Sequence, residues 1–218
     1  MKQMLKDTLI LFVITLVAGL ALGAVYLVTK EPIAVQQEKK KANAYRTVFS
    51  DAASFEDEKN FDAQEARAVL DQADNADYSE EEITMIASAL DESGELLGYV
   101  VTVTTHAGYG GDITFSMGIR LDGTINGVSI TDISETAGLG MRAPDVLAPQ
   151  FEGKATDSRF TVTKTGATYP SEIDAISGAT ITSNALTDGV NAGVIYCQYR
   201  MAQNGVISDS AKGGVLYE

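Results

Sequence analysis

The chain has 218 residues, which is enough for one membrane segment and one ordinary domain. Its formal charge of -14 and its pI of about 4.4 exclude the basic stripes that nucleic-acid binding requires, so no nucleic-acid partner is expected. One cysteine, Cys197, and one histidine, His106, exclude an intramolecular disulfide, a cysteine-ligated cluster and a multi-histidine metal site supplied by this chain alone.

Residues 1–30 predict a transmembrane anchor. Residues 8–28 carry no charge and are long enough to cross a lipid bilayer as a helix. A cleaved signal peptide is the alternative, because Lys2 and Lys6 precede the apolar run and Ala21-Leu-Gly23 offers a cleavage site. The run is longer than a usual signal core and continues past that site, so we favour a retained single-pass anchor.

The positive charges around this span conflict with export of the domain. Two lysines precede the span, whereas four lysines and one arginine follow it within residues 30–46. A count of positive charges therefore places the C-terminal side in the cytoplasm. A long domain behind a lone N-terminal span is nevertheless often exported despite such counts. Charge alone leaves the orientation open.

Residues 31–82 are predicted to form a juxtamembrane helix followed by an acidic insertion. Residues 33–55 have helical periodicity, with one apolar face made by Ala42, Tyr45, Val48 and Phe49. Residues 51–82 contain twelve acidic and two basic residues. This stretch is expected to be exposed, partly helical around residues 63–70 and without chemistry of its own.

From residue 83 the apolar period becomes two, which predicts an antiparallel sheet. The predicted strands cover residues 83–89, 97–103, 113–121 and 125–130. Asp122-Gly123 forms the turn of the last hairpin. A meander of about four strands with helices before and after it predicts the α+β class, not a doubly wound sheet. We place this domain at residues 83–204, with a frayed tail at residues 205–218.

The stretch from Asp174 to Ser183 carries the strongest functional signal. It combines a carboxylate, small residues and four hydroxyls directly ahead of a predicted amphipathic helix. A hydroxyl at a helix N-terminus is well placed to carry a phosphate, because free N–H groups and the helix dipole favour an anion. The simpler interpretation is a capping loop. A capping role accounts for the hydroxyl residues Thr182 and Ser183, but it assigns no role to Asp174.

The order Asp174-x-x-Ser177-Gly178-Ala179-Thr180 resembles the flavinylation signature of the FMN-binding domain found in Rnf and sodium-pumping NADH:quinone oxidoreductase complexes. In that family the threonine is esterified to the 5′-phosphate of FMN, which a separate flavin transferase donates from FAD. The resemblance implies covalent FMN on Thr180. It also implies that the other four residues complete this part of the cofactor site.

Two further loops resemble elements of the same family. Residues 134–140 are similar to a Glu-Thr-Pro-Gly-Leu-Gly element that borders the flavin, with alanine here in place of the proline. The cofactor-binding residues that this likeness implies are Glu135, Thr136, Gly138, Leu139 and Gly140. The glycine-rich turn at residues 106–111 lacks dinucleotide-site spacing, and the resemblance implies that Tyr109, Gly110 and Gly111 shape the fold near the flavin. Arg142 or Lys154 is a candidate to offset the phosphate charge.

The resemblance implies a G-type electron-transfer subunit of a membrane-bound Rnf complex. Such a complex moves electrons between ferredoxin and NAD while translocating sodium ions or protons. Its other membrane, iron–sulfur and flavin subunits would be the partners, and the flavin domain would lie outside the cytoplasm. We expect no catalytic residues and no independent turnover from this chain. The alternatives are the C subunit of the sodium-pumping quinone reductase, and a membrane-tethered binding or regulatory module without covalent flavin.

Overall fold

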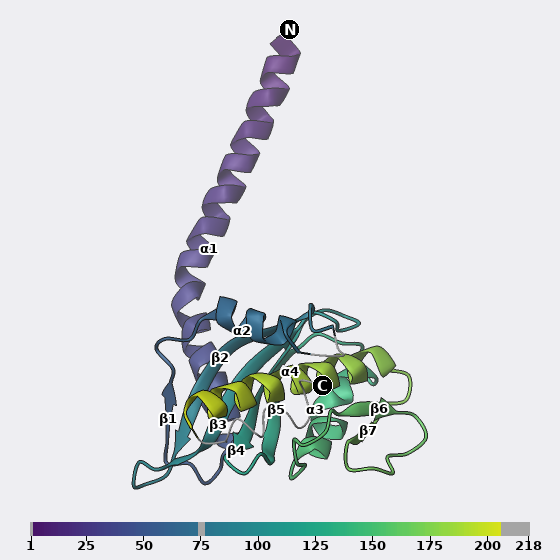
Figure 1. Cartoon of the computed structure of the whole chain (residues 1–218). Coiled ribbons are helices and arrows are strands. Elements are labelled where there is room, and N and C mark those ends of the chain that lie inside the picture. The colour runs from purple at the N-terminus through teal and green to yellow at the C-terminus, as the bar shows by residue number, and fades with distance from the viewer. Residues whose placement is uncertain (1, 74–76, 206–218) are drawn as a thin grey trace. The chain divides into compact units, whose positions relative to one another are not determined.

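The computed structural model describes residues 2–73 and 77–205. The chain divides into two compact units, Met1–Lys41 and Ala42–Glu218. Helix α1 (Lys2–Val48) forms the first unit, and its last turns belong to the second (Figure 1). Among the described residues, α1 is the one helix long and apolar enough to cross a membrane, with a mean hydropathy of 2.6 over 18 residues. The predicted N-terminal apolar helix is confirmed.

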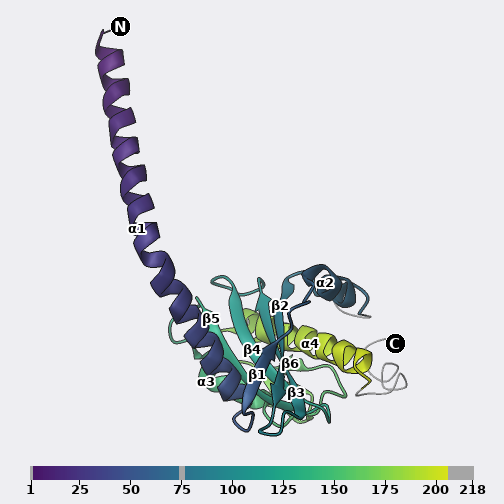
Figure 2. The same ribbon diagram turned by 90° about the vertical axis from the view of Figure 1, so that its left-hand side faces the viewer.

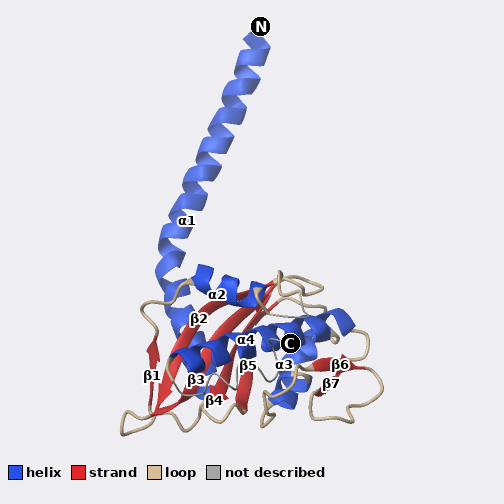
Figure 3. Ribbon diagram, in the orientation of Figure 1, coloured by secondary structure: helices blue, strands red, loops and turns tan. Residues whose placement is uncertain are grey.

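The second unit is built on a five-stranded antiparallel sheet in the order β1-β2-β3-β4-β5 (Figure 3). The strands are β1 (Ser54–Asp57), β2 (Glu81–Leu90), β3 (Leu96–Thr105), β4 (Ile113–Arg120) and β5 (Ile125–Ile133). Each strand pairs with the next strand in sequence, which confirms the predicted meander and the α+β class. The short first strand was not predicted, because three of its four residues are exposed and it lies in the acidic stretch.

Different helices cover the two faces of the sheet (Figure 2). Helix α4 (Thr180–Gln203) lies on one face, against β2, β3 and β4. The larger core lies between this helix and the sheet and includes Phe115, Met117, Leu186 and Val190. The last turns of α1 cover the other face, in a smaller core that contains Tyr45, Val48, Phe49, Ala87, Ala89 and Val100. Ala42, predicted on this apolar face, is exposed, and α1 ends before residue 55.

A β-bulge in β2 changes which side chains face each core. The pairing with β3 shifts between Ile83 and Met85, so Thr84 is an extra residue in the ladder. Ile83 consequently belongs to the core under α4, whereas Met85 Sδ accepts a hydrogen bond from Tyr45 Oη of α1 at 3.3 Å. The alternation that we predicted from Ile83 through Ala89 is therefore wrong at Ile83.

The acidic stretch is not the solvated insertion that its charge suggests. Helix α2 (Ala63–Asp71) packs against α4 and β2, and its buried residues are Ala66, Val69 and Leu70. Buried Tyr78 joins the same core. Arg67 Nη1 donates to the main-chain oxygens of Tyr78 and Glu81 at 2.7 and 3.0 Å. Most of the described acidic side chains of this stretch are exposed, but Glu81 is buried, and the segment helps to close the core.

The chain between β5 and α4 forms short elements along one side of the sheet. These are the 3-10 helix η1 (Gly140–Arg142), helix α3 (Ala143–Val146), the 3-10 helix η2 (Ala148–Phe151), and the parallel pair β6 (Thr161–Thr163) and β7 (Glu172–Asp174). Of the predicted tail, residues 206–218 lie outside the described residues.

Candidate functional site

Three segments that are distant in sequence meet around one pocket of about 470 Å³. They are the turn between β3 and β4, the loop between β5 and η1, and the first turn of α4. The pocket is lined by Tyr109, Glu135, Thr136, Leu139, Gly140, Gly178, Ala179, Thr180, Ile181 and Thr182. Its volume falls within the usual range of small-molecule and cofactor sites.

Thr180 is the first residue of α4 and lies half-buried in the pocket wall. The residue before the helix, Ala179, has no side chain that caps the first turn. The N–H groups of a helix start are usually satisfied by a capping side chain, which is missing here, and the first three residues of α4 line the pocket. This geometry differs from the predicted caps: Thr182 and Ser183 lie inside the first turn, and both are buried.

Ser183 fixes the backbone that presents Thr180. Its hydroxyl donates to Ala179 O at 2.9 Å and accepts from Ile176 N at 3.1 Å. Ala179 N in turn donates to Ile176 O at 2.9 Å. Gly178, within this turn, has a φ of +80°, which favours glycine over residues with a Cβ. The Ser-Gly-Ala-Thr sequence is thus a tight turn tied to the helix that follows it.

The loop after β5 packs closely on the start of α4. A Cβ on Gly140 would lie 2.7 Å from Thr182 Oγ1 and 2.8 Å from Glu135 Oε2, closer than real Cβ atoms come. Glu135 Oε1 accepts a hydrogen bond from Tyr109 N at 2.8 Å. Glu135 therefore contacts the β3–β4 turn on one side and lies close to Gly140, which packs on Thr182 of α4, on the other.

The structure brings seven of the ten predicted cofactor-binding residues together in the pocket lining. These are Glu135, Thr136, Leu139, Gly140, Gly178, Ala179 and Thr180. The other three, Asp174, Ser177 and Gly138, are exposed and do not line it. Gly138 has a φ of +77° and shapes the loop. Asp174 Oδ1 accepts from Ala167 N at 2.6 Å, and its main chain bonds to the Gln150 side chain.

Two residues that were not predicted to bind the cofactor, Ile181 and Thr182, also line the pocket. The helical periodicity that begins at Thr180 places Ile181 on the exposed side, and nothing local distinguishes it from a surface residue. Tyr109, which the resemblance put near the cofactor, also lines the pocket.

No basic side chain is among the described lining residues. Lys154, a candidate for offsetting a phosphate charge, donates from Nζ to the main-chain oxygens of Pro170 and Glu172. Arg142 is exposed on η1 and is not part of the lining either. The groups of the lining that are suited to stabilise an anion are the α4 N-terminus and the hydroxyl groups.

Comparison with known proteins agrees with the fold and the pocket. Residues 108–194 match the FMN-binding domain, and residues 1–48 match the RnfG N-terminal region. The chain is 36% identical over 194 residues to the G subunit of the Na(+)-translocating ferredoxin:NAD(+) oxidoreductase complex of Acetobacterium woodii, covering 88% of this chain and 91% of that protein. It is 30% identical to the G subunit of the ion-translocating oxidoreductase complex of Methanosarcina acetivorans, covering 89% and 95%.

A solved structure, that of Shewanella oneidensis NqrC, shares the fold with a TM-score of 0.52 and 19% identity, covering 75% of this chain and 88% of that chain. The apolar helix and the α+β domain with its pocket define an FMN-binding-domain protein with an N-terminal apolar helix. Within that class, the chain belongs to the family of G subunits of ion-translocating oxidoreductase complexes.

Proposed function

We propose that this protein is the FMN-carrying electron-transfer subunit of an Rnf-type, ion-translocating oxidoreductase, and that Thr180 is the residue that bears the FMN. The observation that carries the proposal is the position of Thr180. It stands at the first position of α4, beside the uncapped N-terminus, in the wall of the pocket that the predicted loops form.

The residues of the pocket suit the two halves of FMN. Thr180 and the first N–H groups of α4 would hold the phosphate, which keeps one negative charge after esterification. Leu139, Ile181 and Tyr109 are apolar or aromatic, line the pocket and have exposed side chains, so they would bury surface against the flavin ring. When bound, the flavin supplies the redox chemistry, and this chain fixes its position.

Attachment is a phosphoryl transfer from FAD, with a separate flavin transferase as the catalyst. A bond forms between Thr180 Oγ1 and the phosphorus of the FMN moiety, and the pyrophosphate bond of FAD breaks. AMP leaves, and the hydroxyl proton is released. The exposed side of the 176–180 turn gives such an enzyme access, because Ser177 and Gly178 are both exposed.

Membership of the complex is proposed from the relatives. They are named as subunits of ion-translocating oxidoreductase complexes, and this chain spans nearly their whole length. Their names differ in the coupling ion, which is sodium in Acetobacterium woodii and the proton in Clostridium ljungdahlii, so the ion is left open. Identity of 36% to a G subunit, against 19% to NqrC, favours the Rnf type over the sodium-pumping quinone reductase.

The test is the intact mass of the full chain, purified after expression with and without a flavin transferase. We expect the transferase to add one FMN less one water, and Thr180→Ala to abolish the addition. Thr182→Val is the matched control, since it removes the neighbouring pocket hydroxyl and keeps the shape of the side chain. Flavin on Thr182 would overturn the choice of acceptor. An unmodified wild type would favour a tethered binding module without covalent flavin.

A further inference from the structure

The turn between β3 and β4, residues 107–111, reaches the pocket through its tip residue, Tyr109. The Tyr109 side chain lines the pocket and is 69% exposed. Its main-chain N–H donates to Glu135 Oε1 at 2.8 Å. The tip is thus tied to the loop on the other side of the pocket, while its aromatic ring has little contact with protein.

Close backbone contacts hold this turn. A Cβ on Gly108 would lie 2.1 Å from Gly111 O, and one on Gly110 would lie 2.2 Å from Ser134 O. The path of the turn therefore requires glycine at both positions. Three of the five residues of the turn are glycines, so few side chains hold the turn in position. Its position depends on the Glu135 contact at its tip and on the contacts at its base.

An ion-pair cluster closes the base. His106 Nδ1 lies 2.9 Å from Asp112 Oδ1, and these two residues flank the turn directly. His106 Nε2 lies 3.6 Å from Glu82 Oε2 of β2. Among the residues that the structure describes, the ionisable groups that face the imidazole are these two carboxylates, Asp112 beside the turn and Glu82 from β2. The hydrogen bond that the Asp112 carboxylate accepts from the imidazole raises the pKa of His106 above its ordinary value, and Glu82 adds to this.

We propose that Tyr109 contacts the bound flavin ring, and that the His106–Asp112 pair is a proton-sensitive positioning element that holds the turn over the pocket. This rests on the proposed flavin at Thr180. A largely exposed aromatic ring at the mouth of a cofactor pocket gains buried area by packing on the cofactor. Tyr109 is then a contact residue, and His106 acts only through the turn.

The direction of the pH effect follows from the charges. Protonated His106 pairs with two carboxylates, so the pair is complete below the ordinary histidine pKa near 6.5. It is lost as the pH rises through the raised pKa of the folded protein. Because all three side chains are partly exposed, the pair shifts the population of the positioned turn by at most about fivefold.

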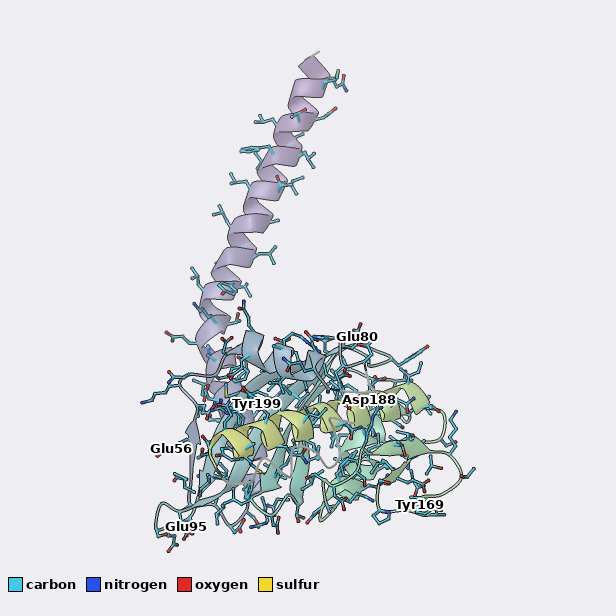
Figure 4. The ribbon with its side chains drawn as sticks, in the orientation of Figure 1. Glu56, Glu80, Glu95, Tyr169, Asp188 and Tyr199 are labelled. Atoms are coloured by element: carbon cyan, nitrogen blue, oxygen red, sulfur yellow. The ribbon has the colours of Figure 1, made fainter. Side chains whose placement is uncertain are left out.

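The chain contains no tryptophan, so a single substitution creates a unique fluorescent reporter. Tyr109→Trp places it at the tip of the turn. Tyr169→Trp is the matched control, because Tyr169 lies in the loop between β6 and β7 (Figure 4) and is 68% exposed. It is not among the residues that line the pocket. In the flavinylated Tyr109→Trp chain we expect severalfold quenching of the indole emission relative to the same chain with Thr180→Ala. The Tyr169→Trp chain should show much less.

The second measurement follows the emission of the Tyr109→Trp chain from pH 5 to pH 9, with flavin and with Thr180→Ala. We expect a transition above pH 6.5 that His106→Gln removes in both. Equal emission with and without flavin, in a Tyr109→Trp chain whose mass shows FMN, would overturn the contact. A transition that persists in His106→Gln would overturn the positioning role. If wild type carries no flavin, the proposed contact between Tyr109 and the flavin fails together with the proposed function. The pH titration of the Tyr109→Trp chain with Thr180→Ala still decides the role of His106.

Discussion

Gly140 lies so close to Thr182 that a methyl group on the glycine would be 2.7 Å from the Thr182 hydroxyl oxygen. The same methyl would be 2.8 Å from the Glu135 carboxylate. Two walls of the pocket, the loop after β5 and the start of α4, therefore meet at a residue that has no side chain. The width of the pocket depends on this contact.

The first prediction concerns Gly140→Ala. The added methyl must push Thr182 and Glu135 apart, and overpacking of this kind destabilises a folded protein by about 1–3 kcal/mol. We expect a lower urea midpoint and a reduced yield of flavinylated chain by intact mass. Gly138→Asn is the control in the same loop, because nothing lies within 4 Å of a Cβ there and asparagine tolerates a positive φ. Unchanged stability and flavin yield in Gly140→Ala would contradict the prediction.

The second prediction concerns Ser183→Ala. This change leaves the buried Ile176 N–H without its partner, which costs about 1–3 kcal/mol. It also loosens the turn that presents Thr180, so flavin transfer should become slower. The measurements are urea unfolding, amide exchange at Ile176 and the rate of flavinylation. Asn184→Ala, at the exposed next position of α4, should alter none of them. Equal exchange at Ile176 in the two variants would exclude the proposed role of Ser183.

The fold class and the candidate acceptor residue could be predicted because their signals are local. Strict alternation in residues 113–121 and the Asp122-Gly123 turn specify a hairpin whatever surrounds it, and β4 and β5 form as expected. The Asp174–Thr180 motif is likewise contiguous. Convergence of the three pocket segments could not be derived from periodicity, since it depends on tertiary packing. Only the family resemblance linked them.

The errors in the sequence prediction have the same origin. The β2 bulge at Thr84 is a compromise between two cores, and alternation alone does not reveal it. The acidic stretch was expected to be exposed because of its charge, yet Val69 and Leu70 are buried against the core. Thr182 and Ser183 have the composition of helix caps, but α4 begins earlier, at Thr180. In the first two cases a tertiary contact overrides a correct local preference.

The third prediction concerns the pH dependence of stability. Glu81 is 4% exposed, and burial raises its pKa from 4.5 to about 7, although the Thr105 hydroxyl donates to it at 3.2 Å. The native state therefore favours the protonated carboxyl. Its contribution is complete below pH 4.5 and is lost as the pH rises through about 7. The separation between the ordinary and the folded pKa of Glu81 corresponds to a loss on the order of 3 kcal/mol of stability.

Glu81→Gln should abolish this loss, since the amide stays neutral. We expect the variant to gain stability relative to wild type between pH 4.5 and pH 7, measured by urea unfolding of the detergent-solubilised full chain. Glu92→Gln, an exposed carboxylate in the β2–β3 turn, should keep the wild-type profile. A constant difference between Glu81→Gln and wild type over this range would show that Glu81 does not titrate as inferred.

The fourth prediction concerns the side of the membrane on which the flavin domain lies. Charges around the apolar helix favour a cytoplasmic domain, whereas the family resemblance favours the outer face. Cys197 is fully buried, and burial raises the pKa of its thiol, so it gives little background in labelling with a maleimide. Glu95→Cys adds an exposed thiol on the β2–β3 turn (Figure 4).

In intact cells, a membrane-impermeant maleimide should label Glu95→Cys and leave wild type unlabelled. Gln3→Cys, at the other end of α1, should react only after the membrane is opened, because a retained single-pass helix puts the two positions on opposite sides. Loss of residue 3 from the mature chain would indicate cleavage instead of anchoring. If Glu95→Cys reacts only after lysis, the domain lies in the cytoplasm. The positive charges that follow the span would then have determined the orientation of the helix.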